Sequence, residues 1–233
     1  MQPENPLMAT TPVASAPALA RNRVLRNTYL LLAISMVPTV AGAWLVVQFK
    51  FNLLGAMDPA LGFMLFLAIA FGFFYGIEKT KNSGMGVALL LAFTFFMGLM
   101  LSRMLGVVLG LANGASLIAL AFGGTAAIFG AMSMVATTTK RDLSGMGKFL
   151  FVGVVMLLIA AFANIFLQVP GLAIAISLIA IGIFSAFMLY DVNRIVTGGE
   201  TNYVTATLAI YLDIYNVFTN LLALLGITGG SSD

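Results

Sequence analysis

Long apolar stretches separated by short polar breaks run along most of the chain. Seven stretches each approach the ~20 residues that an α-helix needs to cross the hydrocarbon core of a bilayer. They lie at about 28–47, 59–77, 84–102, 115–136, 149–168, 170–190 and 206–227. No break between them is long enough for a soluble domain. The pattern predicts an all-α polytopic membrane protein with seven transmembrane helices.

The two ends of the chain differ from this apolar body. Residues 1–27 are rich in Pro, Ala and Thr and then become basic, with no uninterrupted apolar core. They predict a flexible N-terminal tail and not a cleaved signal peptide. Residues 28–227 form the predicted transmembrane domain, and residues 228–233 form a short C-terminal tail.

Lysine and arginine are distributed unevenly over the predicted helix ends. Nine of the eleven lie on the side of the N-terminal tail, and only Lys50 and Arg103 lie on the other side. Positive residues accumulate in cytoplasmic loops. We therefore predict a cytoplasmic N-terminus and, after seven crossings, a C-terminus outside.

The composition excludes several classes of function. The chain is 61% hydrophobic and 8% charged, whereas a soluble domain has about 25% charged residues. It contains no cysteine and no histidine, which excludes disulfides, zinc sites with these ligands, and Ser-His or Cys-His catalytic pairs. No cofactor is expected. No cluster of Lys and Arg has the density of a nucleic-acid-binding face.

Small residues at four-residue spacing predict where helices approach closely. The pairs are Gly72 with Gly76, Gly106 with Gly110, and Gly182 with Ala186.

Two carboxylates interrupt the last two apolar stretches. Asp213 lies well inside 206–227, where a charge costs on the order of 3 kcal/mol. Asp191 lies at the end of the preceding stretch, before a helix stop at Gly198 and Gly199. The two helices form a predicted antiparallel hairpin whose turn is centred between the two carboxylates. Asp191 and Asp213 are therefore expected at the same depth, where they can face each other.

Asp213, Asn216 and Asn220 share one helical face by their spacings of three and four. A polar stripe points into a helix bundle and not into lipid, so the last helix is predicted to be central.

Two carboxylates in a low-dielectric site tend to share one proton, which predicts a pH-sensitive pair. Without the proton, the pair offers oxygen ligands to calcium. These fall short of the six to eight that calcium prefers, so only weak, transient binding is expected.

A structural interpretation stays open for both carboxylates. Asp213 can accept hydrogen bonds from neighbouring helices without any further role. Asp191 can be an interfacial acid balanced by Arg194, which lies three residues further along the same helix.

At "LYDVNRI" and "LAIYLDIYNVFTNLLALLG" the chain resembles the Bax inhibitor-1 family of seven-helix membrane proteins. The segments "TTTKRDLSGMG", "ANIFLQVP" and "GGETNYVTATLAIYLDIYNVF" resemble its bacterial YccA branch, whose known member modulates the membrane protease FtsH. The resemblance implies a fold of six helices around a central seventh, in a bacterial inner (plasma) membrane. Some bacterial members of the family leak calcium in a pH-dependent way, with a pair of aspartates as the pH sensor. The resemblance implies that Asp191 and Asp213 match this pair. There a basic residue at the end of the second helix engages the pair; here Thr80 stands at that position, between Lys79 and Lys81.

Three functions follow as hypotheses. The first is a non-enzymatic regulatory partner of a membrane protease such as FtsH, with the N-terminal tail as a handle. The second is a pH-gated calcium leak that uses the aspartate pair, with calcium or protons as ligands. The third is an intramembrane aspartyl protease, suggested by Tyr190 before Asp191. The third is disfavoured because Asp213 lies in "YLD" and not in a Gly-x-Gly-Asp motif.

Overall fold

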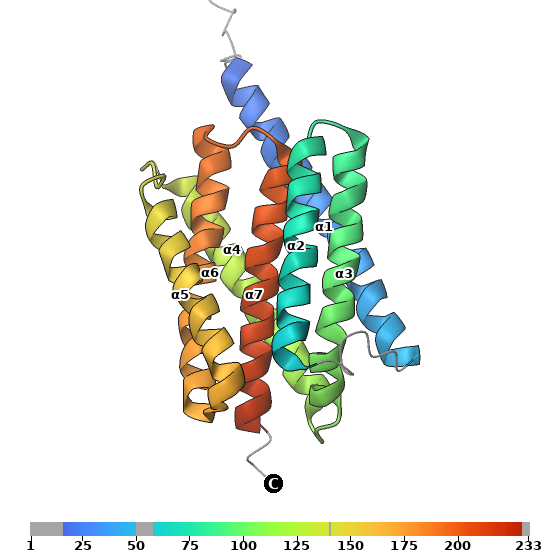
Figure 1. Ribbon diagram of the computed structural model, residues 1–233. Helices are drawn as coiled ribbons and strands as arrows, with labels where there is room; N and C mark the ends of the chain where they lie inside the picture. Colours follow the sequence, from blue (N-terminus) through green and yellow to red (C-terminus); the bar gives the residue numbers. More distant parts are fainter. Residues whose placement is uncertain (1–15, 50–57, 140, 230–233) are drawn as a thin grey trace, which may run out of the picture.

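The computed structural model describes residues 16–49, 58–139 and 141–229, which form seven α-helices and no strand. The helices are α1 (Ala16–Phe49), α2 (Pro59–Thr80), α3 (Gly84–Leu109), α4 (Gly114–Thr138), α5 (Met146–Leu167), α6 (Pro170–Thr197) and α7 (Tyr203–Gly229) (Figure 1). Each is long and apolar enough to cross a bilayer. The predicted all-α fold with seven transmembrane helices is confirmed.

The helix ends differ most from prediction at α1. This helix begins at Ala16 and not near residue 28, so the expected flexible tail is helical from residue 16 onward. The segment that follows Ala16 is rich in Ala, Leu and Arg, which are strong helix formers, and its proline stands in the first turn, where proline is tolerated. Residues 1–15 of the expected tail, and residues 230–233 of the C-terminal tail, lie outside the described residues.

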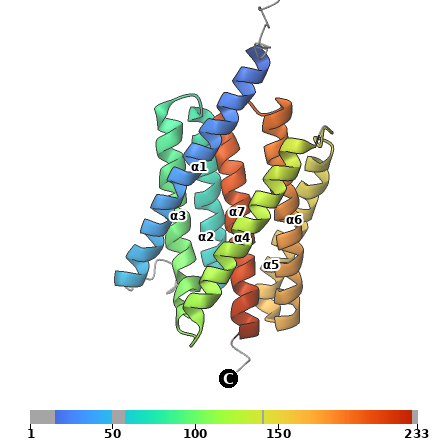
Figure 2. The ribbon, with the colours of Figure 1, turned by 180° about the vertical axis from the view of Figure 1, so that it is seen from behind.

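Helix α7 occupies the centre of the bundle. It packs against α1, α2, α3, α4 and α6, and Figures 1 and 2 show it between helices on both faces. Helix α5 packs against α6 and α2 and does not reach α7. The prediction of six helices surrounding a central seventh is confirmed, with α5 separated from the centre by α6.

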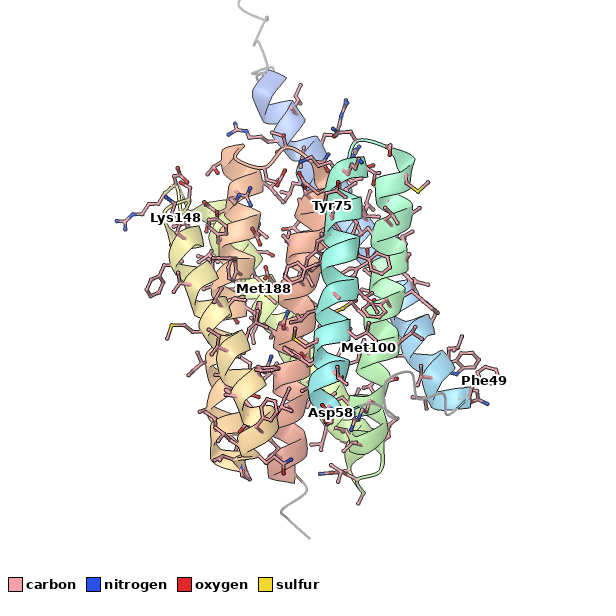
Figure 3. All side chains as sticks on the ribbon, in the orientation of Figure 1. Phe49, Asp58, Tyr75, Met100, Lys148 and Met188 are labelled. Atoms are coloured by element: carbon pink, nitrogen blue, oxygen red, sulfur yellow. The ribbon has the colours of Figure 1, made fainter. Side chains whose placement is uncertain are left out.

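The larger buried cluster lies where α1, α2 and α3 meet α7, and buried residues of α4 and α6 extend it. Aromatic rings fill it: Phe93 of α3 lies 6.3 Å from Tyr211 of α7 and 5.6 Å from Phe73 of α2, measured between ring centroids. Many large apolar side chains point outward instead, as Phe49 does in Figure 3. An apolar exterior is what lipid contact requires.

The closest helix approach joins α1 and α3, at glycines that the small-residue pattern did not select. A Cβ atom at Gly98 would collide with the backbone carbonyl of Thr39, and one at Gly42 would collide with the carbonyl of Phe95. In contrast, a Cβ atom at Gly72, Gly106 or Gly182 would meet nothing within 4 Å. The prediction from four-residue spacing is wrong at these three positions.

The basic residues expected on the tail side gather at one end of the bundle. The start of α1 and the α2–α3, α4–α5 and α6–α7 connections lie at this end, and the C-terminus lies at the other (Figure 1). Figure 3 shows Lys148 extending outward there from the start of α5. Lys50 and Lys140 lie outside the described residues. We call this end of the bundle the basic end.

Candidate functional site: a carboxylate pair at the α6–α7 hairpin

The turn between α6 and α7 sets the depth of both carboxylates. Helix α6 ends at Gly198, whose positive φ of 85° suits glycine. The amide N–H groups of Gly199 and Glu200 then donate to the carbonyl of Arg194, at 2.8 and 3.0 Å. Asn202 caps α7 by accepting from the amide of Val204 at 2.9 Å. The hairpin therefore forms as predicted, with Asn202 as the cap.

Asp191 and Asp213 face each other across this hairpin. Both are buried, with 8% and 4% of their surfaces exposed. The two carboxyl groups interact directly across the hairpin. Two carboxyl groups this close in a low-dielectric site cannot both ionise cheaply. The second oxygen of Asp213, Oδ2, has no hydrogen-bond partner among the described residues.

Arg194 is the basic residue that engages the pair. Its Nη1 lies 3.6 Å from Oδ1 of Asp191, and its Nη2 lies 3.5 Å from Oε2 of Glu200. The guanidinium also lies over the ring of Tyr190, 5.6 Å from the centroid. Glu200 is held in turn by the amide N–H groups of Thr201 and Asn202, each at 2.9 Å. A polar chain thus runs from Asp213 through Asp191 and Arg194 to the turn.

Lys79 and Lys81 do not reach the carboxylate pair. Lys81 forms an ion pair with Glu78 on the same helix. Lys79 lies over the ring of Tyr75, 5.8 Å from its centroid, near the end of α2 (Figure 3). The backbone carbonyl of Lys81 accepts from Nδ2 of Asn202 at 3.2 Å. The α2–α3 connection therefore touches the hairpin turn through the carbonyl of Lys81 and through Oδ1 of Asn82, which accepts from the same Nδ2 at 2.8 Å, and not through a basic side chain.

The two asparagines of the polar stripe are half-buried and bond within their own helix. Nδ2 of Asn216 donates to the carbonyl of Leu212, and Nδ2 of Asn220 donates to the carbonyl of Asn216, both at 2.8 Å. No contact of theirs with the aspartate pair is recorded in the described residues.

Asn193 is a structural residue of this site that sequence reasoning missed. It is fully buried, two residues after Asp191. Its Oδ1 accepts from the amide of Leu143 at 3.1 Å, and its Nδ2 donates to the carbonyl of Arg141 at 3.2 Å. Asn193 therefore ties the α4–α5 connection to the helix that carries Asp191. The signal in the sequence is a third polar residue within "DVNR".

Two tyrosines on another face of α7 were also missed. The hydroxyl of Tyr211 lies 2.9 Å from the hydroxyl of Thr39 on α1. The hydroxyl of Tyr215 donates to the carbonyl of Met97 on α3 at 3.2 Å. Their spacing of four places both on one helical face, which anchors α7 to α1 and α3.

The chemistry of the pair limits what it can bind. Within residues 16–49, 58–139 and 141–229, no group of three or more His, Cys, Asp or Glu side chains could hold a metal ion. Two carboxylates provide few of the six to eight oxygens that calcium prefers. The pair therefore presents few oxygens to a metal ion, and an arginine lies beside it.

The fold and this hairpin define a multi-pass membrane protein with a buried carboxylate pair, and comparison with known proteins identifies its family. The family described as "Inhibitor of apoptosis-promoting Bax1" matches residues 21–230, and the chain belongs to this family.

Relatives match over most of the chain. An uncharacterized protein of Neisseria meningitidis serogroup A is 38% identical over 212 residues, which cover 91% of this chain and 93% of that protein. The Escherichia coli K12 protein named "Modulator of FtsH protease YccA" is 38% identical over 208 residues, covering 89% of this chain and 91% of that protein. The corresponding protein of Escherichia coli O6:H1, named "Inner membrane protein YccA", matches with the same identity and coverage.

Proposed function

We propose that this protein is a non-enzymatic regulatory partner of an FtsH-type protease in the bacterial inner membrane. The observation that carries the proposal is the 38% identity to the modulator of FtsH over 89% of the chain. The match covers 208 residues and is not confined to one motif, and the family match at residues 21–230 includes residues of all seven helices. Similarity of this extent supports a shared mode of action as well as a shared fold.

The start of α1 supports a contact with the cytoplasmic part of such a protease. Helix α1 projects beyond the other helices at the basic end of the bundle (Figure 1). The excess of Lys and Arg at this end supports a cytoplasmic placement. The start of α1 would then lie on the cytoplasmic side, within reach of an ATP-driven protease.

The start of α1 is also attached to the helix that carries Asp191. Nη1 of Arg21 donates to the carbonyl of Val196, in the last turn of α6, at 3.3 Å. A force on the N-terminus therefore acts close to Arg194 and Asp191.

Removing the residues that precede α1 tests the proposal. FtsH would be co-reconstituted with the full chain, with a chain lacking residues 1–15, and with a chain in which a Gly-Ser segment of equal length replaces them. We expect the full chain to bind FtsH and to slow the degradation of a membrane substrate, and we expect both variants to lose this effect. Equal effects from all three chains would refute the role of the N-terminus, and no effect from any chain would refute the proposed function.

A second candidate function, a pH-gated calcium leak, is supported by the buried, directly interacting carboxyl groups of Asp191 and Asp213. With one proton between them the two carboxyl groups hold α6 and α7 together. Without it they repel, and they expose oxygen ligands to a transient calcium ion. Among the described residues, the other charged groups recorded beside the pair are Arg194 and Glu200.

Calcium entry into proteoliposomes tests this candidate. The wild type, Asp191→Asn and Asp213→Asn would be compared from acidic to mildly alkaline pH, with Glu78→Gln as a control at an exposed acid. We expect a pH-dependent leak that either aspartate substitution abolishes and the control preserves. Calcium entry no faster than into empty liposomes would refute the leak.

The same proteoliposomes test the intramembrane aspartyl protease. Product from a membrane-embedded substrate that disappears in Asp213→Asn would replace the non-enzymatic proposal with that third function.

A further inference from the structure

A long groove opens on the face of the bundle opposite to α2. Residues of α1 and α4 line its two sides, residues of α7 line its floor, and residues of α3 line one end. Figure 2 shows α1 and α4 in front of α7 on this face. Its volume is about 1090 Å³, at the upper limit of pockets that take small molecules. Val40, Trp44 and Phe122 line the groove and are also more than half exposed. The groove is therefore open sideways, toward the position of the lipid.

The groove extends over almost the full thickness of a membrane. Its lining residues on α1 extend from Tyr29 to Val47, and those on α4 extend from Ala115 to Ser133. At 1.5 Å per residue, each wall is roughly 27 Å long, close to the ~30 Å of a hydrocarbon core. Such dimensions suit an extended hydrocarbon chain that lies parallel to the helices.

The lining is almost entirely apolar, and most of its hydroxyl groups are already occupied. Thr39 bonds to Tyr211 and to the carbonyl of Ser35, and Thr125 donates to the carbonyl of Ala121. The groove therefore presents hydrocarbon along most of its length and offers little to a polar ligand. A polar part of the ligand can only lie at one of its ends.

An arginine of α1, Arg26, lies one turn beyond the lining residues at the basic end of the groove. Arg26 precedes Ala33, Val40 and Val47 by multiples of seven residues, and all three of these line the groove. Seven residues are nearly two helical turns, so Arg26 continues the same face of α1 beyond Tyr29. Its side chain is exposed, and no ion pair or hydrogen bond of Arg26 is recorded within the described part of the chain.

The wall on α4 adds a hydroxyl at the same end. Oγ of Ser133 is buried and has no hydrogen-bond partner among the described residues, and Ser133 lines the groove. No acidic residue is among the described residues that line the groove, so no carboxylate there would pair with a cationic head group. The positive charge of Arg26 at this end therefore complements a phospholipid head group whose net charge is negative.

We propose that the groove between α1 and α4 is a binding site for an anionic phospholipid, which places its acyl chains between the two helices and its phosphate at Arg26. This site is distinct from the Asp191–Asp213 pair, and it does not depend on a protease or on calcium. Tyr211 and Tyr215 form part of its floor and also join α7 to α1 and α3. A bound lipid would therefore contact the anchors of the central helix.

Two pairs of variants test the site in the full chain. Arg26→Gln removes the charge at the groove, and Arg103→Gln removes an exposed arginine on α3 outside it. Gly130→Leu fills the groove at a position where a Cβ atom meets nothing within 4 Å. Gly72→Leu makes the same change on α2, where a Cβ atom likewise meets nothing within 4 Å.

The readout is the lipid retained by protein purified from vesicles of equal phosphatidylglycerol and phosphatidylcholine. We expect the wild type, Arg103→Gln and Gly72→Leu to retain phosphatidylglycerol preferentially. Arg26→Gln should reduce this preference about fivefold, the effect of one basic residue at a membrane surface. Gly130→Leu should abolish the retention of lipid. Equal retention of both lipids by the wild type, or full retention by Gly130→Leu, would overturn the proposal.

A photo-crosslinking residue identifies the occupant directly. At Val40, inside the groove, adducts should be enriched in phosphatidylglycerol relative to adducts at Val37, which is 68% exposed and is not part of the lining. Adducts at Val40 with a second copy of the chain or with another membrane helix would overturn the lipid assignment.

Discussion

Replacing Asn193 by alanine is expected to release the α4–α5 connection without dismantling the helix bundle. The side chain makes two neutral hydrogen bonds, at 3.1 Å to the amide of Leu143 and at 3.2 Å to the carbonyl of Arg141. Each such bond contributes about 0.5–1.5 kcal/mol net. The expected loss is therefore about 1–3 kcal/mol in total.

Hydrogen exchange at the amide of Leu143 measures this loss locally. If exchange proceeds through local opening of the connection, the amide should exchange roughly five- to over a hundredfold faster in Asn193→Ala. Limited cleavage by trypsin after Arg141, which is exposed, should accelerate in the same variant. Both effects follow from freeing a backbone segment that one buried side chain holds.

Asn216→Ala is the matched control. Asn216 donates only to the carbonyl of Leu212 in its own helix, so its removal should leave the exchange of the Leu143 amide unchanged. If Asn193→Ala also left that exchange unchanged, the assignment of Asn193 as the clamp of the α4–α5 connection would be refuted.

Three further predictions concern packing, capping and charge. Gly98→Ala should destabilise the bundle by about 1–3 kcal/mol, because the added Cβ atom collides with the backbone of α1. Gly106→Ala should not destabilise it. Reversible unfolding in detergent compares the two variants, and equal stability would contradict the predicted collision. Asn202→Ala should cost at least about 1 kcal/mol in the same assay, because it removes the cap of α7 and also the donation from Nδ2 to the α2–α3 connection. An unchanged stability would contradict both contributions. The amide of Ser144 donates to Asp142 and lowers the pKa of this exposed carboxyl below its usual 3.8. The turn is therefore stabilised above that value and loses this contribution as the pH falls through the lowered pKa. The chemical shift of the Ser144 amide should follow this titration in the wild type and not in Asp142→Asn.

The position of the carboxylate pair could be predicted because it depends on local rules. Apolar stretches near the length of a membrane span indicated seven helices, and a helix stop at Gly198 indicated a hairpin. In an antiparallel hairpin, residues equidistant from the turn lie at one depth. Asp191 and Asp213 satisfy this condition, and the structure places them in contact.

The sequence offered Arg194 as the basic partner of the carboxylate pair only as one of two possibilities. The spacing of three between Asp191 and Arg194 permitted an ion pair, while the resemblance to the family directed attention to Lys79 and Lys81. The structure selects Arg194. The choice depends on how far each helix is rotated about its axis, and that rotation is set by packing against the rest of the bundle.

What the sequence alone determined is therefore the number of helices, their order, the central place of α7 and the level of its buried carboxylate. These follow from hydropathy and helical periodicity, which act over a few turns of one chain segment. The tertiary structure alone decided which glycines bring α1 against α3, which backbone groups Asn193 holds, and that α1 and α4 stand apart to leave a groove over α7. These features depend on the crossing and rotation of helices that are distant in sequence, and side-chain packing across the whole bundle fixes both.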